Sequence, residues 1–96
     1  MNAVYAGTFD PVTCCHLDII ERASKMYDVL YVTIFVNPQK TTLFSLEERL
    51  ALLKEVTKTY ANVRVDFSDD LAVSYAKKMN APILVRGLRA TMDFEY

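Results

Sequence analysis

Short apolar segments rich in β-branched residues alternate along this chain with longer segments that have helical periodicity. The apolar segments cover residues 2–6, 29–36, 63–67 and 82–85. Apolar side chains recur at helical spacing in residues 16–27, 45–60 and 70–79, and a fourth helical pattern starts near Ala90. The resulting order, βαβαβαβα, predicts an α/β fold: a Rossmann-like parallel sheet with helices on both faces and right-handed crossovers.

Two of the expected helices have recognisable start signals. Ser45 is followed three residues later by Glu48, which fits a capping box at the start of the second helix. Thr13 is a candidate N-cap for the first helix. His16 would then lie in the first helical turn, where backbone N–H groups and the helix dipole favour an anion.

Composition excludes several classes of protein. Hydrophobic residues make up 52% of the chain, and 11 basic residues face 12 acidic ones. This balance argues against intrinsic disorder and against a general nucleic-acid coat. There is no apolar run of about 18 residues and no signal-peptide pattern, so we expect no membrane span. The only cysteines, Cys14 and Cys15, are adjacent and fit reduced thiols of a cytoplasmic protein.

With 96 residues, the chain has the length of one domain. Doubly wound sheets usually continue to five or six strands, whereas only four are expected here. The helical pattern that starts near Ala90 still runs at Tyr96. We therefore expect residues 1–96 to form a single domain that is truncated at its C-terminus.

Glycine and basic residues follow the expected strands at their carboxyl ends, where parallel α/β sheets bind ligands. These residues are Gly7 and His16 after the first strand, Lys40 after the second, and Arg86, Gly87 and Arg89 after the fourth. Arginine grips phosphate oxygens in a bidentate manner, and lysine adds a point charge. The pattern predicts a phosphate-bearing ligand.

Each of these residues also has a simpler interpretation. His16 can be an ordinary cap, Lys40 a solvated side chain, and the segment from Arg86 to Arg89 a basic loop. Cys14, Cys15 and His16 are spaced too closely for known zinc motifs. Cys15 lacks an orienting group that would make it a nucleophile. The glycine-rich dinucleotide motif and the Walker A lysine loop are both absent from the sequence.

Four stretches of the sequence resemble bacterial phosphopantetheine adenylyltransferases, of the nucleotidyltransferase α/β superfamily. They are Gly7-Thr8-Phe9-Asp10-Pro11 with Thr13 and His16, residues 44–49, residues 85–90 and residues 93–96. The resemblance spans the whole chain, which corresponds to about the first three-fifths of a typical member. It implies a nucleotidyltransferase-like domain that transfers an adenylyl group from ATP to 4′-phosphopantetheine. The products are dephospho-coenzyme A and pyrophosphate, in the penultimate step of coenzyme A biosynthesis.

The resemblance also implies roles for individual residues. ATP would be bound by Gly7, Thr8, Phe9, His16, Gly87 and Arg89. The phosphopantetheine substrate would be bound by Thr8, Lys40, Leu71, Ala72 and Arg86. The catalytic residues would be His16, Lys40 and Arg86. Mg²⁺ would accompany ATP without a protein ligand set, and the enzyme would be a cytoplasmic homo-oligomer, a hexamer in the family, with no nucleic-acid or membrane partner.

The sequence departs from the family pattern in two ways that keep alternatives open. Cys15 stands where the family usually has glycine, and a later acidic residue and a serine-rich motif are missing from this chain. One alternative is therefore a non-catalytic fragment that binds a nucleotide or phosphopantetheine. Another is a cytidylyl- or nicotinamide-mononucleotide-type transferase. Those families usually carry a histidine pair where this chain has Thr13 and His16.

Overall fold

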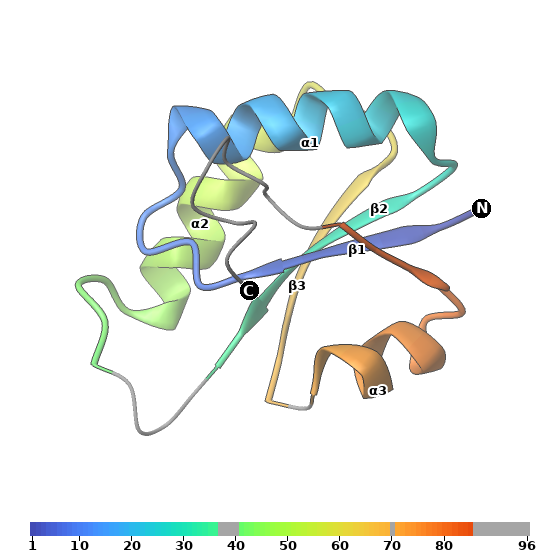
Figure 1. Ribbon diagram of the computed structural model, residues 1–96. Coiled ribbons are helices and arrows are strands. Elements are labelled where there is room, and N and C mark those ends of the chain that lie inside the picture. The colour runs from blue at the N-terminus through green and yellow to red at the C-terminus, as the bar shows by residue number, and fades with distance from the viewer. Residues whose placement is uncertain (37–40, 70, 86–96) are drawn as a thin grey trace, which may run out of the picture.

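A computed structural model describes residues 1–36, 41–69 and 71–85 of the chain (Figure 1). Four parallel strands form its sheet: β1 (Ala3–Gly7), β2 (Leu30–Phe35), β3 (Val63–Ser68) and β4 (Ile83–Val85). The order across the sheet is β3-β2-β1-β4, so β1 and β2 occupy its centre. The predicted parallel α/β sheet is confirmed, and the helix expected from Ala90 lies outside the described residues.

Helices cover both faces of the sheet, as the sequence predicts. Helices α1 (Cys14–Met26) and α2 (Leu46–Thr57) lie on one face, and α3 (Ala72–Lys78) lies on the other (Figure 1). Alternate residues of β1 serve the two faces, because Ala3 and Tyr5 belong to one core cluster and Val4 to the other. No helix in the described part of the chain is long and apolar enough to cross a membrane.

Both predicted helix caps are confirmed, although the helix bounds differ from the expected ranges. Thr13 caps α1 and Ser45 caps α2, each in a reciprocal capping box with the residue three positions later. The first helix begins at Cys14 rather than 16 because a cap at Thr13 leaves the next residues helical. The second ends at Thr57 rather than 60. There the chain tightens into a turn, in which the Tyr60 N–H donates to the Thr57 carbonyl at 2.9 Å.

A polar contact within an apolar cluster holds the short helix α3 on the sheet. The Tyr75 hydroxyl donates to Oδ2 of Asp66 on β3 at 2.9 Å. The Tyr75 ring meets the ring of Phe35 on β2 edge to face, with the centroids 5.6 Å apart. Burial raises the pKa of Tyr75 to about 12, and the neighbouring carboxylate of Asp66 acts in the same direction. Folding therefore favours the protonated phenol.

We expect this phenol to make the protein less stable at alkaline pH. A folded-state pKa above the unfolded value of 10 stabilises the fold fully below pH 10, and this stabilisation is lost as the pH rises toward about 12. Urea unfolding of the wild type and of Tyr75→Phe between pH 8 and pH 12 measures the effect. The variant should be less stable at neutral pH, because Oδ2 of Asp66 loses the hydroxyl donor, and should lose less stability on alkalinisation. Equal alkaline losses in the two proteins would contradict the assignment.

Candidate functional site

The strand order places a crevice at the carboxyl end of β1. Strands β2 and β3 follow β1 on one side, whereas β4 pairs with β1 on the other side. Open α/β sheets bind ligands at such a reversal of strand order, outside the carboxyl ends of the strands. The loop that joins β1 to α1 leaves the sheet at this point (Figure 1). The fold therefore places the segment from Gly7 to His16 at the expected binding edge.

Phe9 gives this loop its shape. Its backbone has a φ of 49°, which is in the left-handed region that bulky residues rarely adopt. The ring is only 1% exposed and packs edge to face against Tyr5 of β1, with the centroids 5.3 Å apart. A second contact is with the ring of His16, at 4.9 Å between centroids. Burial of this ring compensates the backbone conformation and fixes the loop against α1.

His16 is oriented by the helix cap that it helps to form. The Thr13 backbone N–H donates to Nδ1 of His16 at 2.9 Å, and the Thr13 hydroxyl lies 3.0 Å from the same nitrogen. In return, the His16 backbone N–H donates to the Thr13 hydroxyl at 3.4 Å. Since a backbone N–H can only donate, Nδ1 must accept, and the network assigns the hydrogen to Nε2. The half-buried ring thus carries an N–H donor, the type of group that stabilises charge on a phosphate oxygen.

Two charged residues that the sequence analysis did not single out hold this loop against α2. Both carboxylate oxygens of Asp10 accept backbone N–H groups, from Leu43 at 2.6 Å and from Phe44 at 2.8 Å. Arg49 is 5% exposed, and its Nη1 donates to the Thr8 carbonyl at 3.1 Å. One signal for Arg49 was present in the sequence, because it lies four residues before the buried Leu53 on the apolar face of α2.

The structure brings together part of the predicted site. Gly7, Thr8, Phe9 and His16 lie at the carboxyl end of β1, as described above. Leu71 stands apart, at the N-cap of α3 after the edge strand β3, and is 78% exposed. Ala72 is the first residue of α3. The other predicted residues, Lys40, Arg86, Gly87 and Arg89, lie outside the described residues.

Metal-ligating side chains do not cluster in the described part of the chain. No three His, Cys, Asp or Glu residues there are grouped so that they could hold a metal ion. Cys14 and Cys15 are free thiols, and both are exposed on the first turn of α1.

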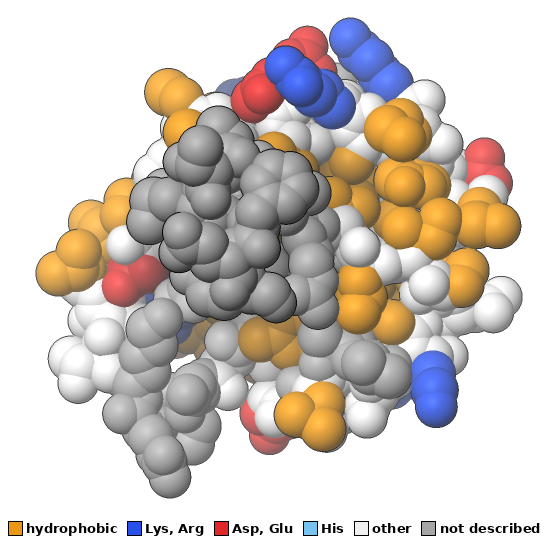
Figure 2. Space-filling model, in the orientation of Figure 1, with side chains coloured by type: hydrophobic (Ala, Val, Ile, Leu, Met, Phe, Trp, Pro, Cys, Tyr) orange, Lys and Arg blue, Asp and Glu red, His pale blue; other side chains and the backbone are white. Residues whose placement is uncertain are grey.

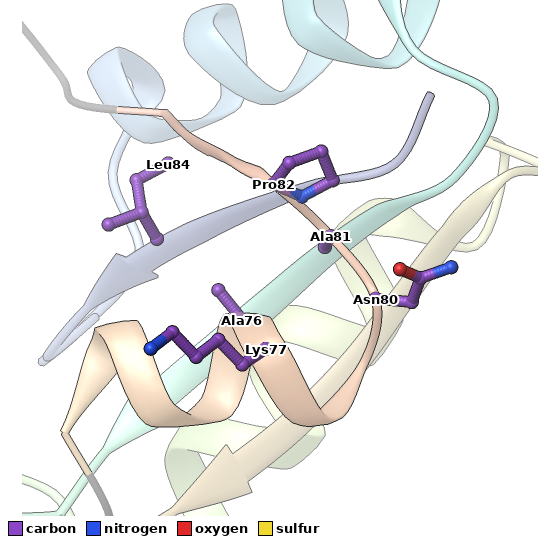
Figure 3. Close-up of a pocket in the computed structure, with 6 residues that line it drawn as sticks. All are labelled: Ala76, Lys77, Asn80, Ala81, Pro82 and Leu84. Atoms are coloured by element: carbon purple, nitrogen blue, oxygen red, sulfur yellow. The ribbon is translucent and has the colours of Figure 1, made fainter.

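An apolar hollow of about 430 Å³ lies elsewhere, between α3 and β4 (Figure 3). Its lining comes from the end of α3 and from the residues around the start of β4: Ala76, Lys77, Asn80, Ala81, Pro82 and Leu84. Elsewhere on the surface, hydrophobic side chains gather at the upper right of the view, toward the C-terminal end of α1 (Figure 2). Because Asn80, Ala81 and Pro82 precede β4, the hollow lies toward the amino end of the strand. It is therefore separate from the binding edge.

Residues 4–96 match the sequence profile of the family described as cytidylyltransferase-like. The chain is also 54% identical over 94 residues to the phosphopantetheine adenylyltransferase of Caldanaerobacter subterraneus subsp. tengcongensis, covering 98% of this chain and 59% of that protein. It is 55% identical over 94 residues to the enzyme of the same name from Alkaliphilus oremlandii, covering 98% of this chain and 60% of that protein. For the enzyme of this name from Desulfatibacillum aliphaticivorans, the identity is 50% over 95 residues, covering 99% and 54%. The chain thus spans less than two-thirds of the length of these curated relatives.

Gly7 offers a direct test of the packing in the β1–α1 loop. A Cβ added at this position would lie 3.1 Å from two ring carbons of Phe9, which is closer than ordinary van der Waals contact. The Phe9 ring is 1% exposed and packs against Tyr5 and His16, so it has little room to give way. We expect Gly7→Ala to lower the free energy of unfolding by about 1–3 kcal/mol, as overpacking does. Urea unfolding measures this change.

A double-mutant cycle isolates the cause. In a Phe9→Leu background the clashing ring carbons are absent, so the same Gly7→Ala change should be less destabilising. An equal loss of stability in both backgrounds would show that crowding by the Phe9 ring is not the reason for glycine at this position.

Proposed function

The chain belongs to the cytidylyltransferase-like family, and on this premise we propose that it transfers an adenylyl group from ATP to 4′-phosphopantetheine. The products would be dephospho-coenzyme A and pyrophosphate, in a step of coenzyme A biosynthesis. One observation carries the proposal: an oriented histidine donor at the β1 switch point, in a chain 50–55% identical to curated phosphopantetheine adenylyltransferases. A nucleotidyltransferase of this substrate class is the function that the geometry supports best.

In the proposed reaction, a phosphate oxygen of phosphopantetheine attacks the α-phosphorus of ATP in line with the departing pyrophosphate. The new P–O bond forms as the bond to pyrophosphate breaks, and no covalent enzyme intermediate is needed. Such a reaction depends on positioning and on stabilisation of charge at the α-phosphate. The Nε2–H group of His16 is suited to that role because Thr13 fixes the ring through Nδ1. A phosphate nucleophile is already anionic and needs no general base.

The other predicted residues would bind the two substrates. We propose that Gly7, Thr8 and Phe9 bind ATP with His16, and that Thr8 also contacts phosphopantetheine. Lys40 and Arg86 would hold the phosphate of phosphopantetheine, and Gly87 with Arg89 would line the ATP side. Leu71 and Ala72 would lie against the pantetheine arm, for which an exposed apolar side chain at position 71 is suitable.

We propose that Mg²⁺ enters as part of the nucleotide substrate. Mg²⁺ usually keeps several waters and binds through substrate phosphates with one or two carboxylates. The described residues contain no group of three metal-ligating side chains, and both oxygens of Asp10 already accept backbone N–H groups. A nucleotide-borne ion fits this donor set better than a resident one.

We further propose a homo-oligomeric cytoplasmic enzyme, hexameric as in the family, in which residues 1–96 form a single domain.

Pyrophosphate release from ATP and 4′-phosphopantetheine tests the activity. We expect turnover with ATP and much less with CTP. His16→Ala should lower the rate about 10²–10³-fold, since it removes one donor to the transition state. Lys54→Ala changes an exposed residue of α2 and serves as the control, with a rate near that of the wild type. Thermal unfolding of both variants verifies that they fold. An unchanged rate in His16→Ala would refute the role of this residue.

A second candidate function is a non-catalytic module that binds ATP or phosphopantetheine. It is favoured by Cys15, which lies next to His16 in the first turn of α1, where the resembling family usually has glycine. Calorimetry separates the two functions: binding of either ligand without pyrophosphate release supports the module. An absence of heat with both ligands at millimolar concentration would contradict both functions.

A further inference from the structure

We propose that Asp10 and Arg49 are positioning residues of this site. Together they attach the β1–α1 loop to the start of α2 and thereby hold the ring of His16 in one orientation. The inference deepens the proposed function and rests on it only where ATP binding is the readout. Both residues lie in stretches that carry the family resemblance, but neither has a role among those that the resemblance implies. We call the two side chains and their four backbone partners the α2 clamp.

The acidic half of the clamp is bidentate. Oδ2 of Asp10 accepts the Leu43 N–H at 2.6 Å, and Oδ1 accepts the Phe44 N–H at 2.8 Å. These two residues immediately precede Ser45, the N-cap of α2. Hydrogen bonds from backbone N–H groups to a carboxylate are shorter and stronger than neutral ones. One side chain in the β1–α1 loop therefore fixes the segment that leads into α2.

Arg49 is the basic half of the clamp, and its side chain extends from α2 to the β1–α1 loop. Nη1 of Arg49 donates to the Thr8 carbonyl at 3.1 Å, and its Nε donates to the Ser45 carbonyl at 3.4 Å. The side chain is 5% exposed, and it forms no ion pair with a carboxylate of the described residues. Burying a guanidinium against carbonyl groups alone is costly compared with an apolar residue. A core position that served packing alone would favour leucine, as at Leu53 in the next turn.

The clamp reaches His16 through Phe9. Asp10 and the Thr8 carbonyl flank Phe9 in the chain, so the clamp fixes the backbone on both sides of its left-handed conformation. The Phe9 ring, 1% exposed, packs against the His16 ring at 4.9 Å. Release of either half of the clamp would let Phe9 leave the left-handed region and withdraw the ring that supports His16. A contiguous series of contacts thus connects α2 to His16.

The state of the His16 ring distinguishes positioning from simple stabilisation of α2. His16 is the only histidine of the chain, so ¹⁵N signals of a histidine ring report on it without ambiguity. In the wild-type protein we expect Nδ1 to give the signal of a nitrogen without hydrogen and Nε2 that of an N–H. In Asp10→Asn and Arg49→Lys, loss of the supporting Phe9 ring would let the His16 ring swing away from the Thr13 N–H, so we expect averaged signals from two tautomers. We also expect ATP affinity about tenfold or more weaker, in proteins that remain folded.

Each variant has a matched control. Arg49→Lys keeps the positive charge, but one ammonium cannot replace a guanidinium that spans two carbonyl groups. Arg64→Lys makes the same change at an exposed residue of β3, where Nη1 donates to the Ala61 and Val63 carbonyls. Asp28→Asn removes an exposed carboxylate that pairs with the N-terminus. Both controls should retain the His16 ring signals and the ATP affinity of the wild type.

The His16 ring signals of the clamp variants test the α2 clamp directly. Wild-type ring signals in both folded clamp variants would overturn it, and so would averaged signals in the wild-type protein itself. If the variants unfold, amide hydrogen exchange of the wild type decides. The Leu43 and Phe44 amides should then be protected, and exchange as fast as in an unstructured peptide would overturn the clamp. A wild-type protein that binds no ATP would refute the proposed function, while the ring signals would still judge the clamp.

Discussion

The buried ring of Phe9 is the contact on which the candidate site depends. It touches Tyr5 of the sheet and His16 of the first helix, and these three rings form one cluster. Its backbone is in the left-handed region, in the loop that leads from the end of β1 to Thr13 at the start of α1. Gly7 leaves the space that this ring occupies. The sheet, loop and helix thus meet at one side chain that performs no chemistry itself.

The topology of the parallel sheet determines where the β1–α1 loop lies. All four strands run in the same direction, and β1 lies at the reversal of strand order. The β1–α1 loop therefore opens where a nucleotide would be bound in an α/β fold. On the same face of the sheet, α2 packs beside α1 and contributes Arg49 to the loop from its buried side. In the part of the chain that the structure describes, α1 and α2 thus lie on the face from which Arg49 supports the β1–α1 loop.

Much of the fold could be predicted from the sequence because hydrophobic periodicity and helix caps are local signals. The apolar segment at 29–36 and the helical spacing of Leu46, Leu50 and Leu53 determine the layers, and Thr13 and Ser45 show where helices begin. The clamp could not be predicted, since Asp10 and Arg49 have backbone partners 33 to 41 positions away. Backbone partners leave no mark in a pattern of side chains. The left-handed conformation of Phe9 was equally hidden, because it depends on burial of the ring and not on the type of residue.

The capping box of Thr13 and His16 has a thermodynamic consequence for ligand binding. The His16 ring, which would contact a phosphate, already accepts a hydrogen bond from the Thr13 N–H at the start of α1. Its rotational freedom is therefore lost when the helix forms, and an arriving ligand does not have to order it again. The histidine ring is therefore ordered in the same transition that forms the first turn of α1. Fraying of α1 at its first turn would consequently appear as a weakened affinity for ligand, although no residue that touches the ligand had changed.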